Sequence, residues 1–162
     1  MSTVDLRVSG SPNADEITLI HKWLRMYARY AELQGWEMRP KTPHESCEGP
    51  SNVLAEIRGE NVYNKLKYED GVHRIQWVPP AERQGRVHTS RLFVVVVREV
   101  GDPRGIRSSA GDGPIRTYSF PLGRVTDHRL GLTFYELDHI LDGRLDPIVE
   151  ALAEHEGRDP DA

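Results

Sequence analysis

The segment from Val87 to Val100 limits the possible folds of this chain more than any other feature. It is rich in β-branched residues, and its centre, Leu92–Val97, is apolar at six consecutive positions. Successive side chains of a strand point to opposite faces, so a run that is apolar at every position predicts a strand in the middle of a sheet. The run is also far shorter than the roughly 20 residues that cross a bilayer. We therefore expect a sheet around this segment and no membrane span.

Capping residues and helical periodicity predict three helices. Asn13, followed by Glu16 three positions later, is a typical N-terminal capping pattern, and Gly35 is placed to end that helix. The second and third helices, each opened by a capping pattern, are expected at residues 133–142 and 146–155.

Alternating or β-branched residues predict further strands, with breaker residues between them. Asp70-Gly71 is a typical hairpin signal. Pro79-Pro80 predicts a strand end, because proline cannot donate a hydrogen bond to a sheet. The expected fold class is α+β, with helices packed on one mostly antiparallel sheet. The expected strands cover residues 4–8, 53–57, 63–68, 72–78 and 115–120, and the expected loops or irregular segments cover 38–52, 79–86, 101–114 and 123–132.

Length and composition indicate one folded domain. The chain has 162 residues, of which 38% are hydrophobic and 28% are charged. The lone Cys47 cannot form an internal disulfide, which agrees with a reducing compartment. Asp5 and Arg7 occupy the region where a secretory signal needs apolar residues. We therefore expect a cytoplasmic protein.

The net charge of −4 is unevenly distributed. Residues 71–129 contain 10 Arg, no Lys and 5 acidic residues, whereas residues 130–162 contain 2 basic and 9 acidic residues. Arginine is well suited to bidentate phosphate contacts and to stacking on bases, so the basic middle favours contact with a nucleic acid. The alternative is that arginine is simply the default cation of this chain. The acidic C-terminal third is expected to face away from any polyanion.

Several segments together strongly resemble the bacterial class I peptide chain release factors, in the family's order and over nearly the whole chain. The resemblance implies the family's decoding superdomain, an α+β unit that sits in the ribosomal A site and contacts ribosomal and messenger RNA. Residues 1–100 and 115–157 would form this one split domain, with 101–114 as a linker and 158–162 as a tail. The segments that carry the resemblance are Arg25–Glu32, Val62-Tyr63, Leu66–Glu69, Gly71–Gln76, Val78-Pro79, Gln84–Ser90, Ile115–Pro121, Gly123–Arg129, Leu137-Asp138 and Gly143–Asp146.

The resemblance also assigns roles to individual residues. Gln76, His88 and Thr89 resemble the residues that contact the second and third codon bases, while Asn13 and Glu16 lie where the family reads the first uridine. For His88, the alternative is a surface histidine at the start of a strand. The family's Pro-x-Thr tripeptide reads Pro79-Pro80-Ala81 here, and Ala81 has no hydroxyl to contact a base. The candidates for phosphate or ribosomal RNA contact are Arg74, Arg83, Arg86, Arg124 and Arg129, although a self-contained turn is an alternative role for Arg129.

The catalytic part of the family is missing from this sequence. Release factors hydrolyse peptidyl-tRNA with a Gly-Gly-Gln domain inserted between the two halves of the superdomain, but the chain contains no Gly-Gly pair. Residues 101–114 occupy the insertion point, and fourteen residues stretch to only about 48 Å. The resemblance also indicates that the family's N-terminal domain is absent. We expect no catalytic residue, so any hydrolysis would require a second chain.

Other chemistry is not supported by the residues. His88 and Thr89 are adjacent on a strand and point to opposite faces, so they cannot form a nucleophile and base pair. His44 and Cys47 lack the four partners of a structural zinc site. We expect a monomer without metal or cofactor. The alternative function is a repurposed protein-interaction module that no longer binds ribosomes and uses its acidic terminal helices instead.

Overall fold

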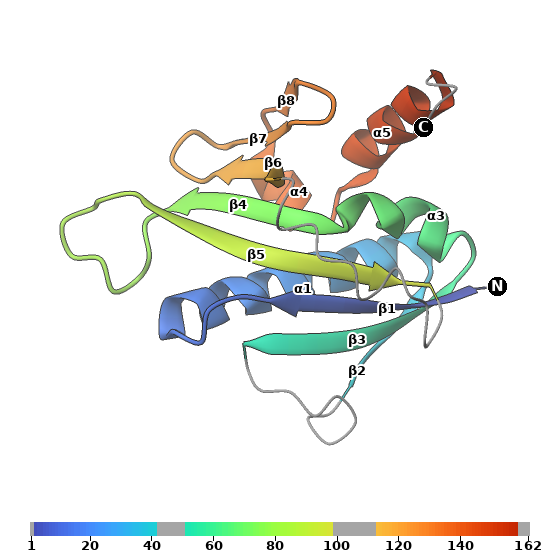
Figure 1. The fold of residues 1–162 in the computed structure, drawn as a ribbon, viewed down its shortest axis with the longest axis horizontal. Helices are drawn as coiled ribbons and strands as arrows, with labels where there is room; N and C mark the ends of the chain where they lie inside the picture. The colour runs from blue at the N-terminus through green and yellow to red at the C-terminus, as the bar shows by residue number, and fades with distance from the viewer. Residues whose placement is uncertain (1, 42–50, 99–112, 159–162) are drawn as a thin grey trace.

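The computed structural model describes residues 2–41, 51–98 and 113–158, which form one eight-stranded sheet with helices packed against it (Figure 1). The strand order is β2-β3-β1-β5-β4-β6-β7-β8. Among these strands, only β4 and β6 pair in parallel, so the expected α+β class with a mostly antiparallel sheet is confirmed. The strands are β1 (Ser2–Ser9), β2 (Glu37–Pro40), β3 (Asn52–Gly59), β4 (Gly71–Trp77), β5 (His88–Val97), β6 (Pro114–Ser119), β7 (Arg124–Asp127) and β8 (Leu132–Phe134). The helices are α1 (Ala14–Gln34), α3 (Val62–Leu66), the 3-10 helix η1 (Lys67–Glu69), α4 (Leu137–Leu141) and α5 (Asp146–Arg158).

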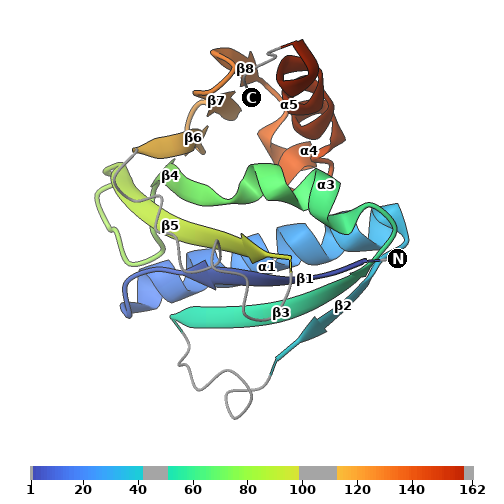
Figure 2. The same cartoon turned by 45° about the vertical axis from the view of Figure 1, so that its right-hand side comes forward.

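The long helix α1 covers one face of the sheet, as both views show (Figures 1 and 2). It begins and ends as the sequence predicts: the Asn13 side chain accepts a hydrogen bond from the Glu16 backbone, and Gly35 adopts the left-handed conformation with φ of 78°. Its apolar residues recur at helical spacing, so they form one stripe that packs into the core. The buried residues of α1 are Leu19, Ile20, Trp23, Met26, Tyr27, Tyr30 and Ala31.

Strand β5 is the fourth of eight strands and pairs with β1 and β4, which confirms the central strand predicted from its sequence. Its two apolar faces differ, however. Leu92, Val94 and Val96 are buried on the α1 side, whereas Phe93 on the opposite face is 38% exposed. Burial therefore alternates along β5, because helix α1 packs against only one of the two faces. We call the opposite face the open face.

The predicted strand at residues 63–68 and the hairpin after it are wrong. Residues 62–69 form α3 and η1, in which Val62, Leu66 and Glu69 are buried at helical spacing. Gly71 does not form a hairpin turn; with φ of 145° it begins β4. A Cβ atom at this position would lie 2.7 Å from Cγ2 of Ile115, so glycine is required for the close approach of β4 and β6.

The C-terminal half also departs from the sequence prediction. Residues 123–132, expected to be irregular, contain β7 and the start of β8, and Thr133 lies in β8 rather than capping a helix. Helix α4 begins four residues later, after Glu136, whose side chain makes no capping bond. Residues 38–40 of the expected loop 38–52 belong to β2, while 42–50 lie outside the described residues.

The remaining predicted elements are confirmed within a few residues: β1, β3, β4, β6 and α5. Strand β6 begins at Pro114, one residue before the expected strand, and α5 extends to Arg158, three residues past the expected helix end. Of the expected linker, residues 101–112 lie outside the described residues. In the described ranges, no helix is long and apolar enough to cross a membrane.

Candidate nucleic-acid interface

The strand register places three of the candidate residues, Gln76, Thr89 and Arg124, in one row on the open face of the sheet. Gln76 of β4 lies directly opposite Thr89 of β5 and beside Ser119 of β6, which in turn pairs with Arg124 of β7. Register partners project on the same side of a sheet. Thr89, Gln76, Ser119 and Arg124 therefore form a continuous row of polar side chains across four strands, which we call the first row.

A second row lies beside the first on the same face. Arg74 of β4 is opposite Arg91 of β5 and beside Thr117 of β6, and Thr117 is followed by Thr126 and Thr133 on the next two strands. Sequence analysis missed Arg91, although its position two residues after Thr89 places it on the same strand face. Neither row contains a carboxylate. Ser119 and Thr117 on β6 are buried, at 5% and 8% exposure, so the side chains of the other strands supply the accessible part of this polar and basic surface, which is suited to phosphate and base contacts.

The loop between β4 and β5 contains the tripeptide at Pro79-Pro80-Ala81. Within this loop, Pro80 and Ala81 are exposed, whereas Pro79 is buried at the base. The backbone N–H of Glu82 donates to the carbonyl of Pro79 at 3.0 Å, which closes a tight turn. Ala81 is thus presented to solvent at the tip of a constrained turn.

Glu82 organises the rest of this loop. Its carboxylate accepts hydrogen bonds from the Gln84 backbone, from Nε of Arg86 at 3.2 Å and from Nε2 of His88 at 3.2 Å. These bonds, the Gln84 backbone first, hold the pKa of Glu82 below its usual value. His88 pairs in register with Trp77, on the side of the sheet opposite Thr89, as the alternation of a strand predicts. Sequence analysis did not identify Glu82 as the residue that positions His88 and Arg86. The candidate Arg83 lies in the same loop and is exposed.

The other predicted codon-reading residues form the start of α1. The Oδ1 atom of Asn13 accepts from the Glu16 backbone at 2.9 Å, and the Glu16 carboxylate accepts from the Ser11 backbone at 2.9 Å. Asn13 therefore caps the helix, while Glu16 binds the backbone two residues before the cap, so both side chains are engaged. In both views the start of α1 and the β4–β5 loop lie at the same end of the molecule (Figures 1 and 2). A Cβ atom on Gly10 would lie 2.9 Å from Cδ2 of Leu92, so this glycine lets the turn pack against β5.

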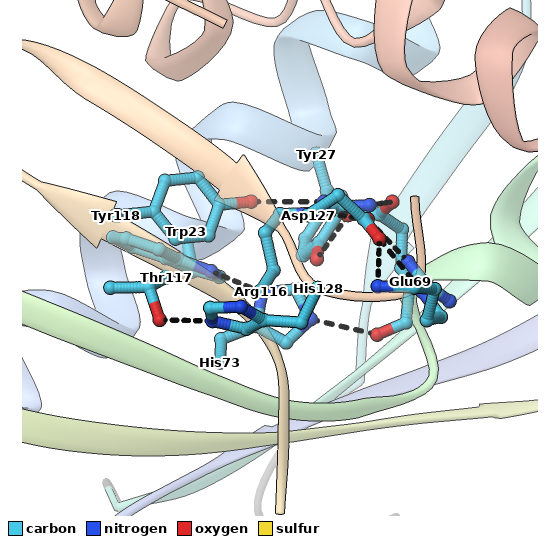
Figure 3. A network of polar contacts seen from close by, with 10 residues as sticks. Trp23, Tyr27, Glu69, His73, Arg116, Thr117, Tyr118, Asp127 and His128 are labelled. Atoms are coloured by element: carbon cyan, nitrogen blue, oxygen red, sulfur yellow. Dashed lines mark hydrogen bonds and ion pairs between the residues drawn. The ribbon is translucent and has the colours of Figure 1, made fainter. Parts of the chain in front are cut away.

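A buried network of charged residues supports the open face from beneath (Figure 3). The Arg116 guanidinium donates to the two Glu69 oxygens at 2.8 and 2.9 Å and to Asp127 at 3.2 Å. Tyr27 also donates to Glu69, at 3.0 Å. Burial favours the neutral form of Glu69, but the adjacent Arg116 outweighs it, so the pKa of Glu69 lies below its usual value. This network joins α1, η1, β6 and β7.

His73 lies in the same buried layer and is held in one tautomer. Trp23 donates to Nδ1 of His73 at 3.2 Å, so Nε2 carries the proton and donates to the Glu69 carbonyl at 2.8 Å. Burial, aided by the nearby charge of Arg116, lowers the pKa of His73 to about 4. The imidazole is therefore neutral near pH 7 and acts as a structural bridge.

Arg129, a candidate for phosphate contact, is bound within its own turn. Its backbone N–H, Nε and Nη2 all donate to Asp127, at 3.0, 3.2 and 2.8 Å. These contacts are those expected of the self-contained turn, the alternative role for this residue. His128 turns instead toward the sheet, where its Nε2 lies 2.6 Å from Oγ1 of Thr117 in the second row (Figure 3). Among the described residues, no group of three or more histidine, cysteine or acidic side chains could hold a metal ion.

Comparisons with known proteins agree with this fold. The family model described as the PCRF domain matches residues 18–94. Peptide chain release factor 1 of Caldicellulosiruptor bescii is 34% identical in an alignment 236 positions long. The alignment covers 94% of this chain and 66% of that protein. Peptide chain release factor 1 of Streptococcus thermophilus is 32% identical over 231 residues, which cover 91% of this chain and 64% of that protein. The chain thus spans about two thirds of the length of these curated relatives.

A solved structure extends the agreement to three dimensions. RF2 of Thermus thermophilus matches 98% of this chain and 69% of its own chain, with a TM-score of 0.75 and 20% sequence identity. The fold defined by the eight-stranded sheet and α1 is therefore that of a translation release factor domain. The chain belongs to the class I peptide chain release factor family.

Proposed function

We propose that this protein binds the ribosomal A site in the cytoplasm and does not hydrolyse peptidyl-tRNA by itself. The observation that carries the proposal is the register of β4 and β5, which sets Gln76 opposite Thr89 on the open face. Both side chains lie on the strands that lead into the loop containing Ala81. Messenger RNA in the A site would contact this end of the molecule, and ribosomal RNA would contact the basic rows beside it.

The lack of hydrolysis is inferred from the chain's own residues. The sequence contains no Gly-Gly pair, and the 236-residue alignment with the C. bescii relative exceeds the whole 162-residue chain by 74 positions. At least that many residues of the relative therefore have no counterpart here. The segment joining β5 to β6 is too short to contain a domain of that size. If peptide release occurs on ribosomes that hold this protein, a second chain supplies the catalytic group.

Codon reading is expected to be weak. The exposed Ala81 has no hydroxyl, so the tripeptide cannot form the side-chain hydrogen bond that a threonine would offer to a base. The Asn13 and Glu16 side chains already accept hydrogen bonds from the backbone N–H groups of Glu16 and Ser11. Binding would then depend more on the basic surface than on the codon.

The experiment is co-sedimentation of the purified protein with ribosomes over a range of salt concentrations, combined with a peptide-release assay. We expect binding that weakens steeply with salt and no release above background. Arg124→Glu should weaken binding. Arg58→Glu is the control and should leave binding unchanged. Arg58 is also an exposed arginine of the open face, but it lies on β3, opposite Glu37 and away from the two rows. Absence of binding at low salt, or clear release by the protein alone, would overturn the proposal.

A second candidate function is protein binding at the opposite side of the molecule. A cavity of about 710 Å³ lies between the end of α1 and the segment from β8 to α5, and its rim includes Leu33 and Tyr135, which are 55% and 72% exposed. The acidic C-terminal helices border this cavity. If Arg124→Glu left the cellular partners of the protein unchanged, this function would gain support over ribosome binding.

A further inference from the structure

Two arginines face each other on the open face. Arg74 and Arg91 are direct register partners in the antiparallel pair of β4 and β5. Like charges at such a position repel each other and destabilise the pairing. In the parts of the chain that the structure describes, neither guanidinium forms an ion pair that would offset this repulsion. A repulsive pair without a counter-charge is the arrangement expected of a site that receives an anion.

A second observation concerns the Arg74 side chain itself. Its Nε atom is buried and has no hydrogen-bond partner. A buried donor without an acceptor is costly, and in native proteins it often marks the place of a missing ion or ligand. An anion above the pair would neutralise both charges and supply the missing acceptor once the Arg74 side chain turns outward toward it.

The neighbouring residues indicate which anion fits. The next register pair of β4 and β5 on the open face is Val72 with Phe93, and the Phe93 ring is 38% exposed. Same-face residues on a strand are about 7 Å apart, a separation that one nucleotide can bridge from its phosphate to its base. Asp5, an acidic residue farther along the open face, lies opposite Val97, and its carboxylate is already paired with Lys41 at 3.2 Å.

We propose that Arg74, Arg91 and Phe93 form a binding site for one unpaired nucleotide of RNA. The phosphate lies between the two guanidinium groups, and the base stacks on the Phe93 ring. This inference rests on the proposed function in that it takes the ligand to be RNA, and it adds a site outside the β4–β5 loop. Thr89 and Gln76 in the first row would contact the adjacent nucleotide.

The test uses fluorescence anisotropy of a labelled 12-nucleotide oligouridine with the full chain. Arg74→Gln/Arg91→Gln should weaken binding at least ten-fold and reduce the salt slope by about 0.7 for the lost phosphate contact. Phe93→Ala should also weaken binding about ten-fold but leave the salt slope unchanged, because it removes stacking and not charge. Arg58→Gln, which removes one charge from the same face, should change binding less than two-fold.

Thermal unfolding of the double variant provides an independent readout. A structural role for the pair predicts a lower melting temperature, whereas relief of the repulsion predicts an equal or higher one. Unchanged RNA binding, or a lower melting temperature with weaker binding, would overturn the site. Displacement of the RNA by millimolar inorganic phosphate would assign the site to free anions and overturn the RNA assignment.

If the double variant binds RNA normally while the wild type still sediments with ribosomes, this site fails and the proposed function stands. If the wild type binds neither, both fail.

Discussion

Replacing Arg116 with methionine tests the buried network that holds the two halves of the sheet together. The side chains of Arg116, Glu69 and Asp127 are fully buried, and the guanidinium contacts both carboxylates. Methionine fills much of the same volume without a charge. The variant therefore removes the electrostatic partner and keeps most of the packing, which separates the two contributions.

The expected loss of stability follows from what remains. Among the described residues, the Glu69 carboxylate would keep only the hydrogen bond from the Tyr27 hydroxyl, whereas Asp127 would keep its bonds from Arg129. Leaving a buried charge without its partner costs about 3–5 kcal/mol. A domain of this kind is stable by about 5–15 kcal/mol in total, so the variant should be close to unfolding.

The loss should also depend on pH. In the wild type, the lowered pKa of Glu69 stabilises the fold above the unfolded-state pKa, and this contribution disappears as pH falls through the native pKa. Without Arg116, burial alone raises the pKa of Glu69, so the carboxyl is protonated in the folded variant at mildly acidic pH. As pH falls, the difference in unfolding free energy between wild type and variant should therefore shrink. The change is about 1.4 kcal/mol for each pH unit in which the folded variant, but not the folded wild type, binds the Glu69 proton.

The assay is urea unfolding followed by tryptophan fluorescence at pH 7 and pH 5. Arg129→Gln is the matched control, because Arg129 is 30% exposed and its loss leaves Asp127 still bound to Arg116. We expect this control to lose about 1–2 kcal/mol, less than the core variant. A loss under about 1 kcal/mol for Arg116→Met, or an equal loss at both pH values, would refute the electrostatic account of this network.

Three further predictions concern individual positions. Because the pKa of His73 is lowered to about 4, NMR should show a neutral imidazole above pH 5, and stability should fall as pH drops from about 6.5 toward 4, where only the unfolded chain takes up the proton; a ring that titrates near 6.5 would contradict this. Gly71→Ala should cost about 1–3 kcal/mol in chemical unfolding, since its φ is 145° and its Cβ would meet Ile115, whereas Gly157→Ala, with open space around it in α5, should be neutral or stabilising by up to about 1 kcal/mol. Ala81→Thr restores a hydroxyl at the loop tip and should tighten binding to ribosomes with a stop codon in the A site about five-fold, the equivalent of about 1 kcal/mol, with no change in melting temperature; equal binding to sense and stop codons would argue against this role.

The fold could be predicted where local signals were complete. Helix α1 has a capping residue at one end, a glycine at the other and an apolar stripe between them, and β5 is apolar over six consecutive residues. Residues 62–69 lack such signals, because a five-residue helix is too short to show its period. The burial of Glu69 could not be predicted either, since its partner Arg116 is 47 residues away in the sequence.

In the candidate site, too, local signals could be predicted from the sequence, whereas contacts between distant residues could not. Gln76, Thr89 and the loop between them are predictable from the resemblance and from the proline pair at the end of β4. Their exact opposition, and that of Arg74 with Arg91, depends on the register of two strands joined by a ten-residue loop. Sequence periodicity gives the face of each side chain but not the partner across the sheet. The role of Glu82 likewise emerges only from the folded loop.

A cryo-EM map of the protein on a ribosome carrying messenger RNA tests the central claim most directly. The account predicts density for the protein in the A site, with the β4–β5 loop against the messenger RNA and the open face toward RNA, while the peptidyl-tRNA stays intact. Density at another ribosomal site, or a loop that points into solvent, would contradict it.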